Sequence, residues 1–290
     1  MSDTVQKDTV LFDFSDKPLE IFSANCAEDE LWPVVQSVFE PGCSILEAGA
    51  GSGRWIKFLC DKGYRAQGIE LNGRDVERFN NLYPDLKLDL GDVRQLPFED
   101  LKFDAIMSLG VLEHLIDGPG SAPREMYRVL KRGGIVIFTV PHVNIMFILE
   151  RIIDPIKYRL LGSNFIRSLF GKKLIHYTRR DELSRVTAIK KRVNPSLPVK
   201  YLYDSCIGTD FYEYRYSRVQ AAKMISDAGL VVDEIRLLYN KDRIFQVFGQ
   251  LVGSYDGQSP VRLNMFGKFI KSVLPKTWTA HMVLVVARRP

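Results

Sequence analysis

Short apolar runs alternate with amphipathic segments over the first half of the chain. The runs at 43–50, 65–71, 103–110 and 135–140 have the length of buried strands, and a shorter strand is expected at 86–91. The intervening patterns predict helices, at 52–62, 73–82 and 122–131, the last of them stopped by Gly133 and Gly134. Strands and helices that alternate at this spacing predict a parallel, doubly wound sheet.

The pattern changes after residue 143 and returns at 216. Residues 144–180 combine apolar and basic side chains at a broken helical spacing, and 181–192 predict a charged helix. From 216 onward the pattern predicts further elements: a helix closed by Gly229, a strand at 231–239, a basic amphipathic helix at 264–274 and a last strand from 281.

Composition places the chain among globular proteins, because 46% of its 290 residues are apolar and 26% are charged. The net charge of +5 is unevenly spread: 1–42 carry −7, whereas 143–200 carry +9. No apolar run reaches the roughly 18 residues of a membrane span, and the N-terminus lacks a signal-peptide pattern, so we expect a cytoplasmic protein. The four cysteines form no CxxC pair, which disfavours zinc and a disulfide framework.

The candidate chemistry begins with ILEAGAGSGRW at 45–55. Three glycines stand between a predicted strand and a predicted helix, where the chain turns sharply and a ligand can approach the backbone. Their GxGxG spacing, followed by Arg54, differs from the GxGxxG dinucleotide fingerprint, and no P-loop Lys is present. Glu70 ends the second strand, where a carboxylate can accept ribose hydroxyls. Asp92 follows the third strand and could accept from an adenine amino group.

These motifs, together with FDAIMSLGVLEHL and LKRGGIVIFTVP, resemble class I S-adenosylmethionine-dependent methyltransferases, most closely the small-molecule and lipid branch similar to quinone-pathway enzymes. The resemblance is strong over 40–141 and looser over 216–239 and 281–290. It implies a Rossmann-like α/β fold, with a seven-stranded, mostly parallel sheet, an antiparallel last strand and a helical insert after strand five. The implied cofactor is S-adenosylmethionine and the product S-adenosylhomocysteine.

The resemblance also divides the chain into four parts. These are an acidic N-terminal segment with a cap helix (1–42), the cofactor-binding half of the methyltransferase domain (43–142), a basic helical insert or lid over the acceptor site (143–215), and the C-terminal part of the domain (216–290).

Cofactor contacts follow from the same resemblance. Gly49, Gly51 and Gly53 would line the methionine part, with Glu47 fixing the loop. Glu70 would hold the ribose, and Asp92 and Val93 would face the adenine. The turn at Ser108 and Leu109 would pass beneath the methionine end. Ala50 and Leu71 adjoin these residues and are also expected to bind the cofactor.

Acceptor-side chemistry is less constrained by the sequence. His114 is the first candidate for a catalytic base and His142 the second, although His114 could instead be a wall residue. Glu113, His176, Tyr212 and Tyr214 are expected to bind the acceptor. We expect no metal, because Gly110 stands where metal-dependent relatives carry a further acid.

Three interpretations of the basic insert remain open. It could be a lid with solvated charges, a surface for anionic membranes formed by 143–192 with 264–276, or a site for a phosphorylated or nucleic-acid acceptor. No RNA module is evident, so we expect no nucleic-acid partner. The predicted reaction is methyl transfer to a hydroxyl of a small-molecule, glycan or lipid-like acceptor, by a cytoplasmic or membrane-peripheral protein. The alternatives are N-methylation and a non-catalytic, cofactor-binding scaffold.

Overall fold

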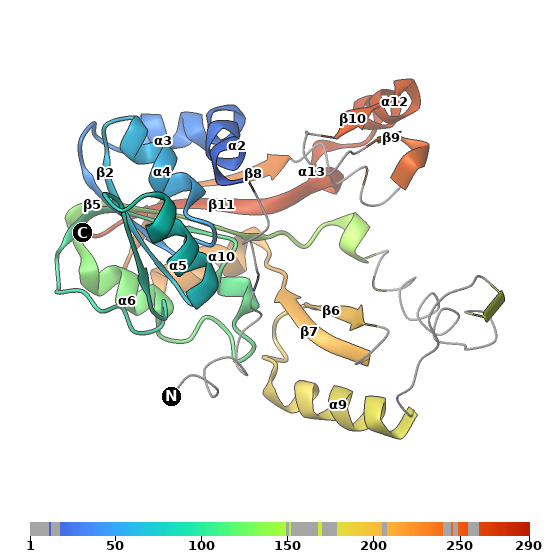
Figure 1. Ribbon diagram of the computed structural model, residues 1–290. Coiled ribbons are helices and arrows are strands. Elements are labelled where there is room, and N and C mark those ends of the chain that lie inside the picture. The colour runs from blue at the N-terminus through green and yellow to red at the C-terminus, as the bar shows by residue number, and fades with distance from the viewer. Residues whose placement is uncertain are drawn as a thin grey trace. The chain divides into compact units, whose positions relative to one another are not determined.

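The computed structural model describes residues 12, 18–148, 151, 168–169, 179–204, 208–239, 245, 249–254 and 261–290 (Figure 1). The chain divides into two compact units. Unit 1 consists of Met1–Val140, Arg218–Arg236 and Leu284–Pro290, and unit 2 of Pro141–Ser217 and Leu237–Val283. The four-part division inferred from the sequence stays a prediction.

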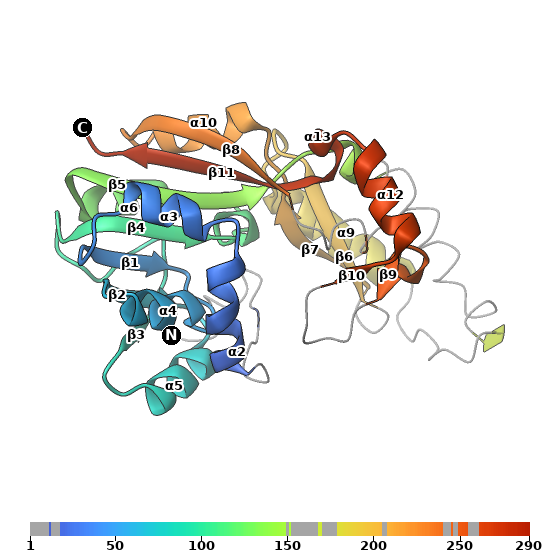
Figure 2. The same ribbon diagram turned by 90° about the horizontal axis from the view of Figure 1, so that it is seen from above.

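A seven-stranded sheet in the order β3-β2-β1-β4-β5-β11-β8 forms the centre of the fold. Its strands are β1 (Ser44–Ala48), β2 (Arg65–Glu70), β3 (Lys87–Leu90), β4 (Phe103–Leu109), β5 (Leu130–Pro141), β8 (Val231–Tyr239) and β11 (Ala280–Arg288). The pairs among β1 to β5 are parallel. Backbone hydrogen bonds from Gly133 to Arg289 and from His142 to His281 give β11 the opposite direction to β5, as Figure 2 shows. The predicted fold class is confirmed.

Helices cover both faces of this sheet in unit 1. They are α2 (Leu19–Ala24), α3 (Trp32–Val38), α4 (Arg54–Asp61), α5 (Gly73–Leu82), α6 (Ala122–Val129) and α10 (Arg218–Ser226), with the 3₁₀ turns η1 (Asn25–Glu28) and η2 (Leu112–His114). Figure 1 shows α3 and α4 on one side of the sheet and α6 and α10 on the other. The contact of α4 with β2 is close, because a Cβ at Gly68 would overlap Cδ1 of Ile56. Apolar faces that meet at this distance form a dry core.

One boundary differs from the sequence prediction. Gly133 and Gly134 do not stop a helix, because α6 ends at Val129 and β5 already begins at Leu130. The two glycines lie in an irregularity of the strand, where the pairing with β4 shifts register. Gly133 has a φ of +73°, which favours glycine. The two glycines therefore allow β5 to bend at this point.

Unit 2 contains a smaller set of elements. They are α9 (Arg179–Arg192), β6 (Val199–Asp204), β7 (Gly208–Tyr214), η3 (Gly249–Leu251), β9 (Gly253–Ser254), β10 (Arg262–Leu263), α12 (Met265–Val273) and α13 (Lys276–Thr279). β6 and β7 form an antiparallel pair inside the segment that the sequence predicted as helical. β6 and β7 combine aromatic and charged residues without a clear alternation, so the pattern of apolar positions did not predict these strands. Among the described helices, none combines the length and the apolar character that a bilayer crossing requires.

Asp104 connects three central strands. Its Oδ2 accepts hydrogen bonds from the N–H and the hydroxyl of Ser44 on β1, at 2.9 and 2.6 Å. Its Oδ1 accepts from Nζ of Lys131 on β5 at 2.6 Å. Partial burial opposes ionisation, but these hydrogen bonds outweigh it and lower the pKa of Asp104 to about 2.

We therefore predict that Asp104→Asn lowers the free energy of unfolding at pH 7 by about 1 kcal/mol, a value reduced for solvent screening of this half-exposed pair. Because the folded-state pKa is depressed, this stabilisation is complete above pH 4 and is lost as the pH falls toward 2. Urea unfolding at pH 7 and pH 3 measures it. A wild-type advantage that is the same at both pH values would contradict the assignment.

Candidate functional site

The loop between β1 and α4 takes its shape from three glycines. Gly49, Gly51 and Gly53 have φ of +83°, +52° and +77°, a region that other residues rarely adopt. A Cβ at Gly49 would also lie 2.5 Å from Cγ2 of Val111, and one at Gly53 would overlap the ring of Phe79. Both the backbone angle and the available space therefore require glycine, so the loop presents backbone groups rather than side chains to a ligand.

Glu70, at the end of β2, holds this loop in place. Its Oε2 accepts a hydrogen bond from the N–H of Gly51 at 2.8 Å. Its Oε1 accepts from the N–H groups of Leu71 and Asn72, at 2.7 and 2.9 Å. A carboxylate offers about four acceptor positions, and Glu70 is only half-buried. It can therefore fix the loop and still accept a hydroxyl from a ligand.

A cavity of about 390 Å³ lies at the carboxyl ends of β1, β2 and β4, wholly within unit 1. This edge of an open α/β sheet is where ligands bind. Ten of the sequence-predicted residues line it, namely Glu47, Gly49, Ala50, Gly51, Glu70, Leu71, Asp92, Val93, Leu109 and His114. The fold thus brings together residues that are up to 67 positions apart in the chain.

Glu47 is the most unusual group in the cavity wall. Its side chain is buried, and burial raises its pKa to about 8, although Arg54 acts in the opposite direction. Its Oε2 accepts no hydrogen bond from the described residues. Nε1 of Trp55, on the same wall, likewise has no acceptor among them. Buried polar atoms are rarely left in this state, so both atoms suit a polar ligand.

Asp92 is held in a tight local arrangement. Its Oδ1 accepts from the N–H of Arg94 at 2.8 Å, and its Oδ2 accepts from Nη2 of the same arginine at 2.6 Å. The predicted contact to an adenine amino group would therefore use the remaining lone pairs of an already positioned carboxylate. Val93, the next residue along, is buried and lines the cavity.

His114 ends η2, just after β4, and forms part of the cavity wall. Its Nε2 lies 3.9 Å from Oε1 of the buried Glu113. The ring of Phe12 approaches it edge-on, with the centroids 4.7 Å apart. His114 is only 8% exposed and lines the cavity.

Three other predicted residues of unit 1 lie outside the cavity lining. Gly53 caps the start of α4. The buried hydroxyl of Ser108 donates to the carbonyl of Ala48 at 3.0 Å, which binds β4 to β1. Glu113 stands behind His114 rather than in the wall itself. Their predicted functional roles stay predictions.

The remaining candidates belong to unit 2 or are not described. Nδ1 of His142 lies 3.2 Å from the carbonyl of Tyr216. Tyr212 contacts the ammonium group of Lys200, 5.6 Å from its ring centroid. Tyr214 is fully buried, and its hydroxyl accepts from the N–H of Asn194 at 2.7 Å. His176 lies outside the described residues.

Sequence reasoning missed several aromatic residues of the cavity. Trp55 directly follows the glycine loop and could have been inferred from its position, but Phe12 and Phe22 lie in the N-terminal segment without any motif. Phe12 is tied to the cavity edge of the sheet, since its carbonyl accepts from Nδ2 of Asn72 at 2.7 Å. Only the fold reveals such a contact between residues 60 positions apart.

Comparison with known proteins finds similarity to methyltransferases. A family model described as a methyltransferase domain matches residues 46–138. A probable S-adenosylmethionine-dependent methyltransferase of Mycolicibacterium smegmatis is 30% identical over 101 residues, which cover 35% of this chain and 39% of the relative. Malonyl-[acyl-carrier protein] O-methyltransferase of Serratia marcescens is 29% identical over 34% of this chain and 38% of the relative.

A third relative is named for an RNA substrate. It is a putative 23S rRNA (guanine-N(1)-)-methyltransferase of Bacillus subtilis, 28% identical over 42% of this chain and 42% of the relative. The chain therefore spans about two fifths of the length of each of these three relatives.

A solved S-adenosylmethionine-dependent methyltransferase of Methanosarcina mazei matches with a TM-score of 0.53, over 89% of this chain and 98% of that one, at 15% identity. This likeness concerns the fold. The family match, the relatives and the shared fold agree with the glycine loop and with the carboxylates around it. Residues 46–138 thus match a methyltransferase domain, on the fold of a solved S-adenosylmethionine-dependent methyltransferase.

Proposed function

We propose that the chain transfers a methyl group from S-adenosylmethionine to a hydroxyl oxygen of a small-molecule, glycan or lipid-like acceptor. The observation that carries this proposal is the set of three carboxylates, Glu47, Glu70 and Asp92, around one cavity below a glycine loop. The donors of the cofactor, an ammonium group, a ribose diol and an adenine amine, match these three acceptors. The buried oxygen of Glu47, which lacks a donor among the described residues, supports the fit.

When bound, the cofactor supplies a methyl group that its sulfonium already activates. The protein has to align the acceptor, exclude water and receive a proton. His114 would receive the proton that the acceptor hydroxyl loses as it takes up the methyl group. The buried Glu113, 3.9 Å from the imidazole, would stabilise the cation that forms there. Phe12 restricts the movement of the ring by packing against it.

This histidine favours a hydroxyl as the acceptor, because a hydroxyl benefits from a base during attack. The names of the relatives include both an O-methyltransferase and a guanine N-methyltransferase, so N-methylation is the second candidate. A scaffold that only binds the cofactor is the third. Glu70→Ala separates enzyme from scaffold, since it should weaken cofactor binding and activity together while leaving the binding of a partner protein intact.

The first prediction for the proposed function concerns the proton on Glu47. Because the pKa of its carboxyl is about 8 in the free protein, pairing with the cofactor ammonium releases a proton near neutral pH. We expect the affinity for S-adenosylmethionine to rise between pH 5.5 and pH 7, by up to about tenfold per unit, while the α-amino group remains protonated. Isothermal titration calorimetry in two buffers of different ionisation enthalpy measures both the affinity and the released proton.

Glu47→Gln is the matched variant for this experiment. It should bind the cofactor about 10- to 100-fold more weakly, since a charge-assisted contact is lost, and its affinity should not depend on pH in this range. The raised pKa makes Glu47 destabilising as the pH rises from 4.5 to 8, so the folded variant gains stability relative to wild type at pH 8. Thermal unfolding at pH 5 and pH 8 controls for this. Equal pH dependence in both proteins would exclude Glu47 as the amine partner.

The second prediction concerns His114. We expect His114→Gln to lower kcat by about 10²- to 10⁴-fold and to leave the affinity for S-adenosylhomocysteine within about threefold of wild type. Transfer of labelled methyl to hydroxylated isoprenoid lipids, glycosides and ribosomal RNA transcripts identifies the acceptor and then measures the rate. His142→Gln is the control, because the second candidate base would respond in its place. Labelling of RNA alone would replace the proposed acceptor class by the N-methylation alternative.

A further inference from the structure

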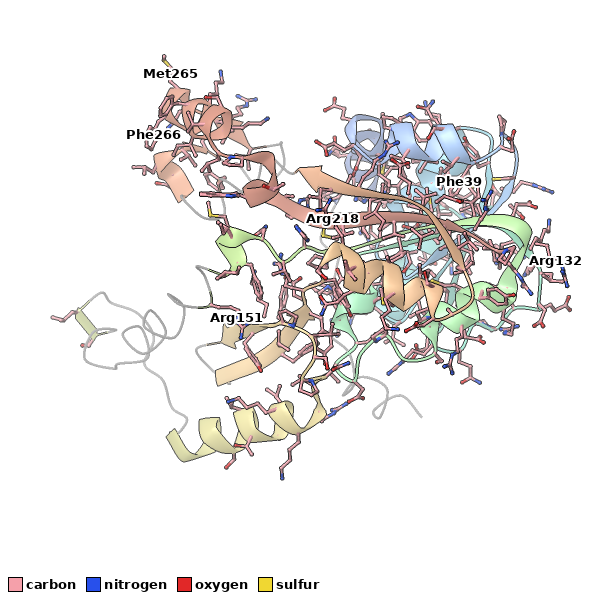
Figure 3. The ribbon with its side chains drawn as sticks, turned by 180° about the vertical axis from the view of Figure 1, so that it is seen from behind. Phe39, Arg132, Arg151, Arg218, Met265 and Phe266 are labelled. Atoms are coloured by element: carbon pink, nitrogen blue, oxygen red, sulfur yellow. The ribbon has the colours of Figure 1, made fainter. Side chains whose placement is uncertain are left out.

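Helix α12 of unit 2 exposes its apolar side chains to solvent. Met265 is 87% exposed, Phe269 60%, Val273 59% and Phe266 48%. Figure 3 shows Met265 and Phe266 projecting from the helix rather than against its neighbouring strands. Large apolar side chains occur singly on most protein surfaces, but four on one short helix mark an interaction site.

The inward side of the same helix lacks a large buried side chain. Gly267 is its buried residue, and a Cβ at this position would collide with the carbonyl oxygen of Val252. At about 100° per residue, Met265, Phe269 and Val273 share a face that points away from Gly267. A helix that packs through a glycine and directs its aromatic residues outward has the opposite orientation from a helix that contributes to a core.

Asn264 fixes this orientation. Its Oδ1 accepts from the N–H of Gly267 at 2.8 Å and caps the helix. Its Nδ2 donates to the carbonyl of Leu251 at 2.9 Å, which binds the start of the helix to the preceding turn. Leu251 is itself 64% exposed. The two hydrogen bonds of the Asn264 side chain therefore fix the first turn of α12 against the preceding turn.

The charge around this face has one sign. Lys268 and Lys271 are both exposed on α12: Lys268 lies beside the apolar face, about 60° around the helix from Met265, whereas Lys271 lies toward the side of Gly267. Residues 257–290 contain no Asp or Glu, whereas the stretch from Arg262 to Lys276 carries four basic residues. Apolar side chains flanked by lysines suit a bilayer with anionic headgroups, because the apolar groups enter the acyl boundary while the ammonium groups reach the phosphates.

We infer that α12, together with Leu251, docks this protein on anionic membrane surfaces. The nine residues of the helix are too few to cross a bilayer, so the helix lies in the interface. The inference does not rest on methyl transfer. Should the proposed acceptor be lipid-like, docking would bring the protein to the surface that contains it.

Vesicle co-sedimentation of the full chain tests the inference. We expect binding to vesicles of phosphatidylcholine and phosphatidylglycerol in a ratio of about three to one, and weak binding to phosphatidylcholine alone. Raising the NaCl concentration from about 50 to about 500 mM should weaken the binding, because screening reduces the lysine contribution. No binding to anionic vesicles at low salt would overturn the inference.

Two double variants separate the apolar and the electrostatic contributions. Phe266→Ser with Phe269→Ser, and Lys268→Gln with Lys271→Gln, should each reduce the vesicle partition coefficient by about tenfold or more. Leu82→Ser with Val219→Ser is the matched control, because these two side chains are 51% and 76% exposed on other helices. Circular dichroism verifies that all variants fold. An aromatic variant that binds as wild type would contradict docking through α12.

A second measurement distinguishes a bilayer from another copy of the chain. Phe269→Trp should show fluorescence quenching by lipids brominated in their acyl chains, which requires insertion of this side chain. Sedimentation velocity reports whether the free protein self-associates through the same face. A dimer that the Phe266 and Phe269 substitutions dissociate, without quenching in vesicles, would assign the face to self-association and overturn the inference.

Discussion

The hydrogen bonds between Glu70 and three backbone N–H groups determine the geometry of the cavity edge of the sheet. The bond from Gly51 joins the glycine loop after β1 to the end of β2, beside the backbone bonds of Gly49 and Ala50 to the carbonyl of Ile69, and the bonds from Leu71 and Asn72 fix the carboxylate itself. Without an acceptor here, the loop N–H groups would be unsatisfied and the backbone of Gly51 could adopt other conformations. The cavity wall therefore depends on a carboxylate that a ligand can also contact.

Glu47 gives the same edge its chemical character. Burial keeps this carboxyl protonated near neutral pH, so the free protein avoids the free energy of burying a charge. Beside a cation the carboxyl ionises and becomes a strong hydrogen-bond acceptor. Glu70 and Glu47 thus divide two tasks that a single acid could not perform together. One is half-exposed and bound to the backbone, and the other is buried with an oxygen that lacks a donor among the described residues.

Much of this edge could be predicted from the sequence because its signals are local. The glycine spacing, Glu70 and Asp92 each stand next to a strand whose apolar run is easily recognised, and parallel order then places them at one edge. Phe12 and Phe22 could not be predicted, because their contacts join distant segments without a motif. The β6–β7 pair was missed for a related reason: its strands lie in a region whose apolar and basic residues suggested helices. Likewise, hydrophobic spacing identified α12, but only the position of Gly267 showed which face points outward.

The chain crosses between the two units four times, after Val140, Ser217, Arg236 and Val283. Unit 2 is therefore not a C-terminal extension of a complete domain. It consists of two insertions, whose ends continue into β5, α10, β8 and β11 of the sheet layer. Such insertions can change in length or be exchanged without altering β1 to β4, where the glycine loop and its carboxylates lie. The family match accordingly covers residues 46–138, which lie wholly within unit 1.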